Sequence, residues 1–248
     1  MEQCSILPII RMQQLHFSEW QEFFWIITKL LEYGLEGLYE LIGTKQKEHT
    51  EYDLNFYTGM QMGIRTVQKT LLWYADEAKT LADQEENGDR KSDLQEMERI
   101  CRKLTKERPE SFREAIQLVI IYTMIDGARE WGRMDDYLAP FYVNDLRNGV
   151  IDEEEAIRLL TSFWQLMIAK EQVTDDRVII GGLGRKHPKE ADELALVIME
   201  VSRRVRDIVP QLTLRMYEGM DERLYKKAMD CIGEGTTYPM LYQDENII

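Results

Sequence analysis

The densest group of side chains that could do chemistry lies between Asp126 and Tyr137, in the sequence DGAREWGRMDDY. It directly follows AIQLVIIYTMI, which is apolar on almost every side and therefore predicts a buried helix. Charges joined to a buried element must be paired or must line a cavity. Two interpretations follow: a salt-bridged segment that orients the helix at 111–125, or a pocket wall that holds an anionic substrate through Arg129 or Arg133.

A cysteine thiolate is the other obvious nucleophile in the chain, which contains Cys4, Cys101 and Cys231. Cys101 and Cys231 fall on apolar faces of predicted helices, where a free cysteine usually serves as a small hydrophobic residue. The wide spacing fits neither a disulfide framework nor a zinc motif. We therefore expect a reducing cytoplasm and no catalytic residue among the three.

Metal and phosphate motifs are missing from the sequence. His16, His49 and His187 are isolated from one another, so each is expected to be an ordinary surface or core histidine and no metal is predicted. The glycine-rich stretch GGLGRK at 181–186 fits neither the P-loop nor the dinucleotide-binding spacing. We interpret it as a tight turn at the end of a strand.

Charge and hydropathy exclude several classes of protein. The chain has 31 Lys and Arg against 45 Asp and Glu, a net charge of -14, which argues against a general nucleic-acid binder. No stretch reaches the roughly 18 to 20 apolar residues that span a bilayer. The N-terminus MEQCSILPIIRM lacks the basic region of a signal peptide. These features predict a cytoplasmic protein without nucleic-acid or membrane partners.

Hydrophobic periodicity predicts a mainly helical chain that ends in a parallel sheet. Apolar residues recur every three or four positions in the first part, and Ser111 with Glu114 and Asp152 with Glu155 form predicted helix caps. Strands are expected at 177–182, 211–217 and 239–243, with a helix at 189–207 and another beginning at Asp221. Strand–helix–strand–helix–strand order predicts a βαβαβ unit, so the fold class is α/β.

The segment SFREAIQLVIIYTMIDGAREWGRMDDYLAPFYVNDLRNGVIDEEEA at 111–156 carries a resemblance to a known family. Its buried helix, Gly-Arg-x-Asp-x-Tyr-Leu turn and acidic helix cap resemble those of the glycyl radical enzymes, the pyruvate formate-lyase-like family. The similarity continues through the following stretches: FW at 163–164, IIGGLG at 179–184, PQLTLRMY at 210–217, GEGTTYPMLYQDENII at 233–248 and, upstream, residues 53–82.

The resemblance implies a ten-stranded α/β barrel, built from two half-barrels inside a helical shell. Residues 1–108 would be the helical entry region, and 109–248 would hold further helices and the βαβαβ start of the first half-barrel, in one truncated domain. Family members are anaerobic lyases, dehydratases and decarboxylases. A glycyl radical oxidises a barrel cysteine, whose thiyl radical abstracts hydrogen from the substrate. A separate iron–sulfur, S-adenosylmethionine-dependent activating enzyme installs the glycyl radical.

The printed sequence departs from this pattern because neither the cysteine loop nor an Arg-x-x-Gly-Tyr radical motif occurs in it. We therefore expect an N-terminal fragment that binds no cofactor and is inactive alone, with possible dimerisation. Its complete enzyme would act on a small polar, acidic substrate. The alternative is a non-catalytic truncated homologue that binds a partner such as the activating enzyme.

Few individual residues can be carried over from the family. A His-Ser pair that dehydratase members place before the turn is replaced by Gly127, Ala128, Arg129 and Glu130, which makes a polyol dehydratase doubtful. Arg129 would instead suit a carboxylate or sulfonate. The candidate substrate-binding residues are Arg129, Glu130 and Arg133, and the structural turn comprises Gly132, Asp135 and Tyr137. Because Arg133, Asp135 and Tyr137 match the turn itself, a structural role is favoured for these three. Strand alternation would place Thr213 and Arg215 toward the barrel interior.

Overall fold

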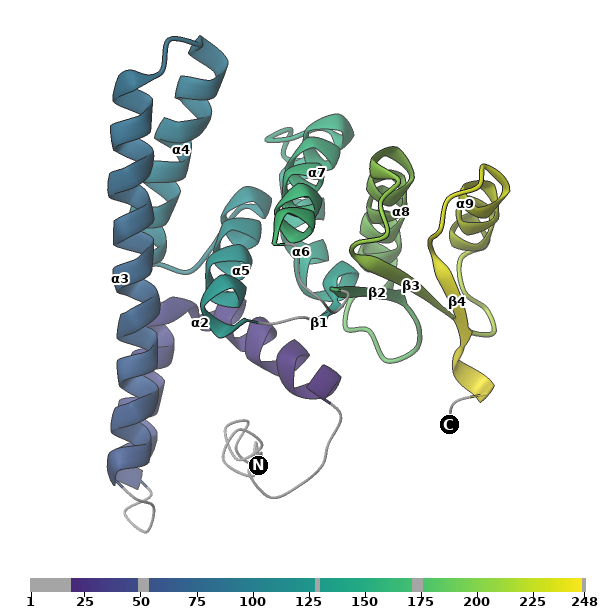
Figure 1. Ribbon diagram of the computed structural model, residues 1–248. Helices are drawn as coiled ribbons and strands as arrows, with labels where there is room; N and C mark the ends of the chain where they lie inside the picture. Colours follow the sequence, from purple (N-terminus) through teal and green to yellow (C-terminus); the bar gives the residue numbers. More distant parts are fainter. Residues whose placement is uncertain (1–18, 49–53, 128–129, 171–175, 247–248) are drawn as a thin grey trace. The chain divides into compact units, whose positions relative to one another are not determined.

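The computed structural model of the chain describes residues 19–48, 54–127, 130–170 and 176–246 (Figure 1). The chain forms two compact units, one of Thr28–Ala128 and one of Met1–Ile27 with Arg129–Ile248. The division predicted between residues 108 and 109, inside one domain, lies within the first of these units. None of the helices in the described segments is both long and apolar enough to span a membrane.

The first unit is helical. It contains α2 (Glu19–Glu48) from Thr28 onward, α3 (Leu54–Gln84), α4 (Gly88–Leu104) and α5 (Phe112–Asp126). The two helices α3 and α4 pack along each other, and α5 contacts both (Figure 1). The buried interior of this unit is apolar and includes Leu35, Leu71, Ala75, Ile100, Leu104 and Leu118, all 0% exposed.

Local chemistry explains where these helices begin and bend. The hydroxyl of Ser111 accepts a hydrogen bond from the Glu114 amide at 3.2 Å, which confirms the predicted cap of α5. Gly34 interrupts α2 with φ 68° and ψ 177°. A Cβ on Gly34 would lie 2.9 Å from the Arg108 Cα, so close backbone approach and backbone conformation both require glycine there.

The second unit is a parallel α/β layer structure. In chain order it contains β1 (Glu130–Arg133), α6 (Met134–Arg147), α7 (Glu153–Ala169), β2 (Arg177–Gly181), α8 (Pro188–Val205), β3 (Gln211–Met216), α9 (Glu222–Gly233), β4 (Met240–Gln243) and the short 3-10 helix η1 (Asp244–Asn246). All strand pairs are parallel, in the order β1-β2-β3-β4. The three predicted strands are confirmed.

One strand was not predicted. The polar and aromatic segment between the predicted helix at 111–125 and Tyr142, for which the sequence predicts no strand, contains β1 and the start of α6. Gly127 ends α5 in the left-handed conformation, φ 70°. Four residues are too short for a periodic signal, and β1 is defined by its pairing with β2, which joins Glu130 to Arg177 and Arg133 to Ile179.

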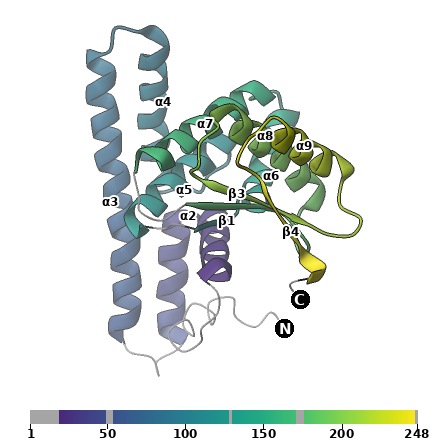
Figure 2. The ribbon, with the colours of Figure 1, turned by 45° about the vertical axis from the view of Figure 1, so that its right-hand side comes forward.

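The two faces of the sheet differ in chemistry. Val178 and Ile180 pair with Leu212 and Leu214, and all four side chains are 0% exposed. Helix α8 packs on β2, and α7, α8 and α9 lie on one side of the sheet (Figures 1 and 2). Connecting helices on one face, as α7, α8 and α9 are in the described residues, are characteristic of barrel-type sheets, whereas doubly wound sheets have connecting helices on both faces.

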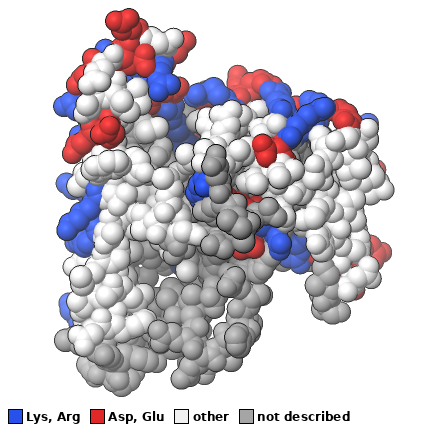
Figure 3. Space-filling model, in the orientation of Figure 1, with Lys and Arg blue, Asp and Glu red and all other residues white. Residues whose placement is uncertain are grey.

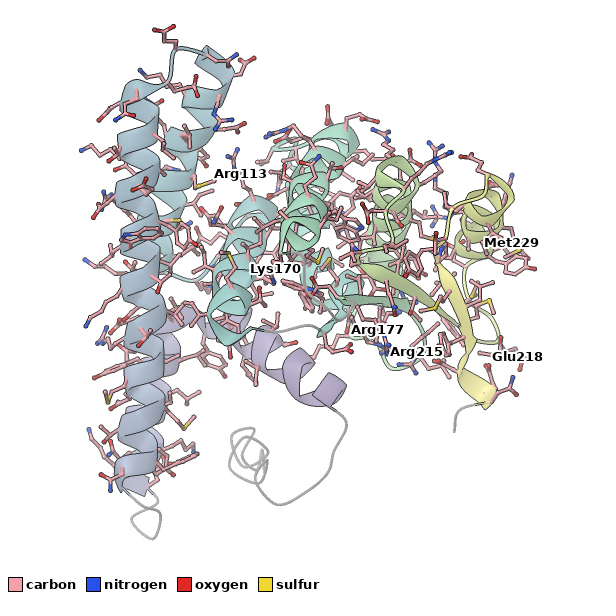
Figure 4. All side chains as sticks on the ribbon, in the orientation of Figure 1. Arg113, Lys170, Arg177, Arg215, Glu218 and Met229 are labelled. Carbon is pink, nitrogen blue, oxygen red and sulfur yellow. The ribbon has the colours of Figure 1, made fainter. Side chains whose placement is uncertain are left out.

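Alternation along the strands puts a second set of residues on the face away from α8. Arg133, Ile179, Thr213 and Met240 form one row across the four strands, through their paired positions. Gly181, Arg215 and Tyr242 form the next row toward the carboxyl ends of the strands. The predicted placement of Thr213 and Arg215 on the same face as each other follows from this register, and Figure 4 shows Arg177 and Arg215 on the side away from α8.

Charged residues on the surface form ion pairs of both signs. On the face shown in Figure 3, basic and acidic side chains occur in small mixed groups. Arg102 pairs with Asp76 at 2.7 Å on the helical unit, and Arg204 pairs with Glu154 at 2.7 Å on the α/β unit. These pairs are exposed, so each contributes little to stability.

Candidate functional site

The carboxyl ends of the four parallel strands bring together three arginines and several carboxylates. Arg133 ends β1, Arg185 lies in the loop after β2, and Arg215 lies near the end of β3. Asp135 begins α6 and Asp244 follows β4. Ligands of parallel α/β sheets bind outside the carboxyl ends of the strands, so this edge is the candidate site.

The loop after β2 is built from glycines that adopt left-handed conformations. Gly181, Gly182 and Gly184 have φ of 74°, 83° and 79°, which agrees with the predicted turn at the end of a strand. A Cβ on Gly182 would lie 2.5 Å from Nη2 of Arg133 and 3.0 Å from Cβ of Arg215. Gly182 therefore lets the Arg133 guanidinium lie directly against the backbone of this loop.

Two aspartates at the start of α6 hold the glycine loop in place. Oδ2 of Asp135 accepts hydrogen bonds from the Gly181 amide at 2.8 Å and from Nη1 of Arg185 at 3.2 Å. Oδ1 of Asp136 accepts one from the Lys186 amide at 2.9 Å. Burial raises the pKa of Asp135 to about 7, against the opposing attraction of Arg185. The carboxylates thus tie the end of β1 to the end of β2.

Arg185 is fully engaged by its surroundings. Besides Asp135, it pairs with Oδ1 of Asp192 at 2.8 Å. It donates to the Tyr217 hydroxyl at 3.2 Å and to the Gly182 carbonyl at 3.1 Å. Its side chain is completely buried, and a buried guanidinium needs such partners. Arg185 is therefore a positioning residue that connects the ends of β2 and β3.

Arg215 is paired as well. Its Nε donates to Oδ1 of Asp244 at 2.7 Å. The other carboxylate oxygen of Asp244 accepts a hydrogen bond from the Leu183 amide at 2.8 Å. The Asp244 side chain is 0% exposed. This carboxylate closes the edge between β3, β4 and the glycine loop.

Arg133 differs from both neighbours. Its Nε and Nη2 are buried and have no hydrogen-bond partner, and within the described part of the chain its guanidinium forms no ion pair. Burial lowers the pKa of Arg133, and the nearby Arg215 lowers it further. Asp135 and Asp136 lie close enough to oppose this lowering of the pKa, but in the described segments neither forms an ion pair with Arg133.

The other predicted site residues have separate places. Arg129 lies outside the described residues. Glu130 is half-buried at the start of β1, and Gly132 adopts φ 55° within that strand. Asp135 and Tyr137 belong to the first turns of α6, and the buried Tyr137 hydroxyl donates to the Trp131 carbonyl at 3.0 Å. Among the predicted site residues that the structure describes, Arg133 and Asp135 reach the group at the strand ends.

Sequence reasoning missed three contributors to this edge: Arg185, Asp192 and Asp244. Asp244 lies inside a stretch that resembles the family and Arg185 directly follows another, but they approach Arg215 and Asp135 from positions far away in the sequence. The signal that could have found them is the carboxyl-end rule for parallel strands, applied to the residues that directly follow each strand.

The described cysteines offer no nucleophile. Cys101 and Cys231 are buried free thiols, as their positions on apolar helix faces predicted. Burial raises the pKa of Cys101 to about 11 and also raises that of Cys231, which keeps both thiols protonated. No cluster of three His, Cys, Asp or Glu suited to a metal ion occurs among the residues that the structure describes.

A parallel sheet with helices on one face and a polar carboxyl edge defines the beginning of an α/β barrel. The family model for pyruvate formate lyase-like proteins matches residues 15–248. The chain belongs to this family, whose relatives among known proteins are glycyl radical enzymes.

Three similar proteins illustrate the relationship. The (2S)-3-sulfopropanediol dehydratase of Klebsiella oxytoca is 27% identical over 77% of this chain and 25% of its own length. The 4-hydroxyphenylacetate decarboxylase glycyl radical subunit of Clostridioides difficile is 29% identical over 87% of this chain and 27% of its own. A glycyl radical enzyme from Archaeoglobus fulgidus superposes with a TM-score of 0.73, at 25% identity, over 87% of this chain and 31% of that structure. The chain thus spans about a quarter of the length of the curated relatives it matches.

Proposed function

We propose that this chain is the N-terminal part of a glycyl radical enzyme that acts on a small, polar, acidic substrate by thiyl-radical hydrogen abstraction. The chain supplies part of the helical shell and the first strands of a half-barrel. The radical glycine and the cysteine loop would lie in further sequence, so the 248 residues alone are proposed to be inactive and to bind no cofactor. The proposed compartment is the cytoplasm.

The observation that supports an acidic substrate is the unpaired Arg133 guanidinium at the carboxyl edge of the sheet. A partly buried guanidinium without a direct ion pair or hydrogen bond at two of its nitrogens is costly unless an anion binds there. The names of two relatives agree with this chemistry, because 3-sulfopropanediol carries a sulfonate and 4-hydroxyphenylacetate carries a carboxylate. Arg129, which lies outside the described residues, is a second candidate for binding the anionic group of the substrate.

In the proposed reaction the thiyl radical takes a hydrogen atom from a substrate carbon, which leaves a thiol and a carbon-centred substrate radical. The residues of this chain would hold the substrate rather than carry the radical. Arg133 would fix the anionic end, and Asp135 with Arg185 would keep the glycine loop beside it in position. Orientation of this kind determines which carbon meets the thiyl sulfur.

Partners are part of the proposal. A radical S-adenosylmethionine activating enzyme would install the glycyl radical in the complete protein. The alternative function is a non-catalytic chain that binds a partner such as this activating enzyme. One observation is relevant to it: β4 pairs only with β3 within the described residues, and a parallel edge strand needs a further partner strand or cover.

The test begins with the coding DNA beyond the codon for Ile248. We expect an open frame that reaches a cysteine loop and an Arg-x-x-Gly-Tyr-like motif. The protein from that frame, activated anaerobically, should then show a glycyl radical by electron paramagnetic resonance and convert acidic substrates in preference to uncharged analogues.

A stop codon directly after Ile248 would overturn the radical-enzyme proposal and leave the partner-binding alternative. That alternative would then be tested by sedimentation of the 248-residue chain with and without the activating enzyme. Faster sedimentation of the mixture would support it, and independent sedimentation of the two proteins would reject it.

A further inference from the structure

The guanidinium of Arg133 presents one complete edge without hydrogen bonds. Nε and Nη2 are the two nitrogens of the side-on edge, the geometry with which arginine binds both oxygens of a carboxylate or sulfonate. Both atoms are buried and have no partner in the described structure. Nearby carboxylates contact other groups through one or both oxygens: Oδ2 of Asp135 accepts from Arg185, Oδ1 of Asp136 accepts from the Lys186 amide, and Asp244 pairs with Arg215. The second oxygens of Asp135 and Asp136 are buried without a hydrogen-bond partner, and both residues act on Arg133 through their charge.

The hydroxyl of Thr213 is a second buried polar group without a hydrogen-bond partner. Its side chain is on the same face as Arg133 and in the same row of the sheet, with Ile179 between them. The residue is only 6% exposed, and its Oγ1 has no hydrogen-bond partner. Burying a hydroxyl without a hydrogen-bond partner is unfavourable, so the presence of this threonine calls for an explanation.

The glycine loop lies beside the Arg133 side chain, which extends from β1 toward the neighbouring strands. Neighbouring strands are separated by roughly 4.8 Å, so Arg133 and Thr213 are about 10 Å apart at their backbones. The Arg133 side chain reaches the end of β2, because a Cβ on Gly182 would lie 2.5 Å from its Nη2. The same hypothetical Cβ would lie 3.0 Å from the Arg215 Cβ and 3.0 Å from Oδ2 of Asp244. Arg215 is two residues beyond Thr213 on the same face of β3.

We propose that Arg133 and Thr213 together bind one oxyanion group of a small organic ligand, a carboxylate or a sulfonate, at the carboxyl edge of the sheet. The side-on edge of Arg133 contacts two oxygens, and the Thr213 hydroxyl donates to the group from β3. Gly182 is the positioning residue, because any side chain there would displace the guanidinium. This inference deepens the proposed function and rests on it for the identity of the ligand as substrate.

The test is a binding measurement on the 248-residue chain that needs no radical. Methanesulfonate and acetate serve as probes in calorimetric titrations, and dimethyl sulfone is the uncharged analogue of methanesulfonate. Sodium chloride at the same ionic strength controls for screening. We expect saturable binding of one or both anions and no binding of dimethyl sulfone.

Variants locate the site. Arg133→Gln should weaken binding by about tenfold or more, and Thr213→Val by about threefold to tenfold, the usual range for losing a charged or a neutral hydrogen bond. Thr213→Ser keeps the hydroxyl and should bind nearly as the parent chain does. Arg147→Gln, which removes a 73% exposed arginine from α6, is the matched control and should leave binding unchanged.

Stability separates a binding role from a structural one. Thr213→Val replaces a buried hydroxyl that has no partner, so the variant should unfold at the same temperature or higher while its anion affinity falls. If Arg133→Gln does not fold, Arg133→Lys and Thr213→Val decide the question, since lysine keeps the charge but loses the two-nitrogen edge.

The proposal would be overturned if the parent chain bound no anion, or if it bound dimethyl sulfone as well as methanesulfonate. It would also be overturned if anion binding were unaltered both in Thr213→Val and in the Arg133 variant that folds. Equal weakening by Arg147→Gln would show a general charge effect and would also reject it. These results are independent of the reading frame and of the radical signal. Failure of the anion subsite is therefore distinguishable from failure of the proposed radical chemistry.

Discussion

Asp135 and Arg185 lie 3.2 Å apart with both side chains fully excluded from solvent, although fifty positions separate them in the chain. Asp135 belongs to the first turn of the helix after β1, and Arg185 belongs to the loop after β2. The pair therefore ties together the exits of two adjacent strands. Because that loop contains Gly182, against which Arg133 lies, the pair positions Arg133 through the backbone.

Removal of Arg185 should be strongly destabilising. Arg185→Met leaves the buried Asp135 carboxyl without its cation, and breaking a buried ion pair in this way costs about 3–5 kcal/mol. Urea unfolding followed by circular dichroism measures the loss. Glu154→Gln, which breaks an exposed pair with Arg204, is the control and should change the free energy of unfolding by less than about 1 kcal/mol. Similar losses in the two variants would contradict the buried pair's importance.

Asp135 should also make stability depend on pH. Burial raises its pKa to about 7 in the folded chain, whereas a free aspartate has a pKa of about 3.9. Between these values the folded chain retains a proton that the unfolded chain releases, so this residue's contribution to stability falls as pH rises from about 4 to about 7.

The variant Asp135→Asn cannot ionise and should remove that contribution. The free energy of unfolding, measured by urea titration at pH 5 and at pH 8, should then fall less between the two values than it does in the parent chain. Asp83→Asn, at an exposed position of α3, serves as the control and should leave the parent's pH dependence intact. An unchanged pH dependence in Asp135→Asn would show that this carboxyl does not titrate in the window.

Several elements were accessible from the sequence because their signals are local. The Ser111 cap depends on residues three positions apart, and the alternation at 211–217 reports a strand with two different faces. The four-residue β1 has no such signal, because EWGR contains a glycine and no alternation. Its strand character comes from pairing with β2, a contact that the sequence does not display.

The candidate site could be predicted from the sequence only in part, because most of its contacts join residues that are far apart in the chain. The charged residues around Arg133 directly follow an apolar helix, and this position predicts that they are paired or line a cavity. Which charges pair was not accessible: Asp135 finds Arg185, and Arg215 finds Asp244, across separate strands. The Nε and Nη2 atoms of Arg133 and the Oγ1 atom of Thr213 are buried without hydrogen-bond partners. This can be recognised only once the strands are assembled into the sheet, so the sequence alone does not indicate it.

Gly182 should be intolerant of a side chain. A Cβ there would lie 2.5 Å from the Arg133 Nη2 and 3.0 Å from the Arg215 Cβ, and φ of 83° adds strain for any other residue. Gly149 has a similar φ of 66° but open space around the Cβ position. Gly149→Ala should therefore cost only the conformational strain, about 1–2 kcal/mol, whereas Gly182→Ala should cost more. Equal losses on urea unfolding would mean that Arg133 moves aside freely.

Cys101 should resist alkylation in the folded chain. It is 0% exposed, and burial raises its pKa to about 11, so little reactive thiolate forms at pH 8. Peptide mass spectrometry after a short iodoacetamide treatment should find this position largely unmodified. The same treatment in 8 M urea, at about the concentration that unfolds most small domains, should modify it fully. Rapid labelling without urea would show that α4 opens readily.

Gly59 and Gly63 lie in the interior of α3, and nothing lies within 4 Å of the Cβ that either would gain on substitution. Glycine inside a helix is about 1 kcal/mol less favourable than alanine, because its backbone loses more freedom on folding. Gly59→Ala and Gly63→Ala should each stabilise the helical unit by up to about that amount. Thermal unfolding followed by circular dichroism at 222 nm, the usual wavelength for helix content, measures the gain in stability.

Gly34→Ala is the contrasting substitution and should destabilise the helical unit, because a Cβ there would meet the Arg108 backbone at 2.9 Å. Destabilisation by the first two substitutions would mean that this face of α3 packs against something that requires glycine.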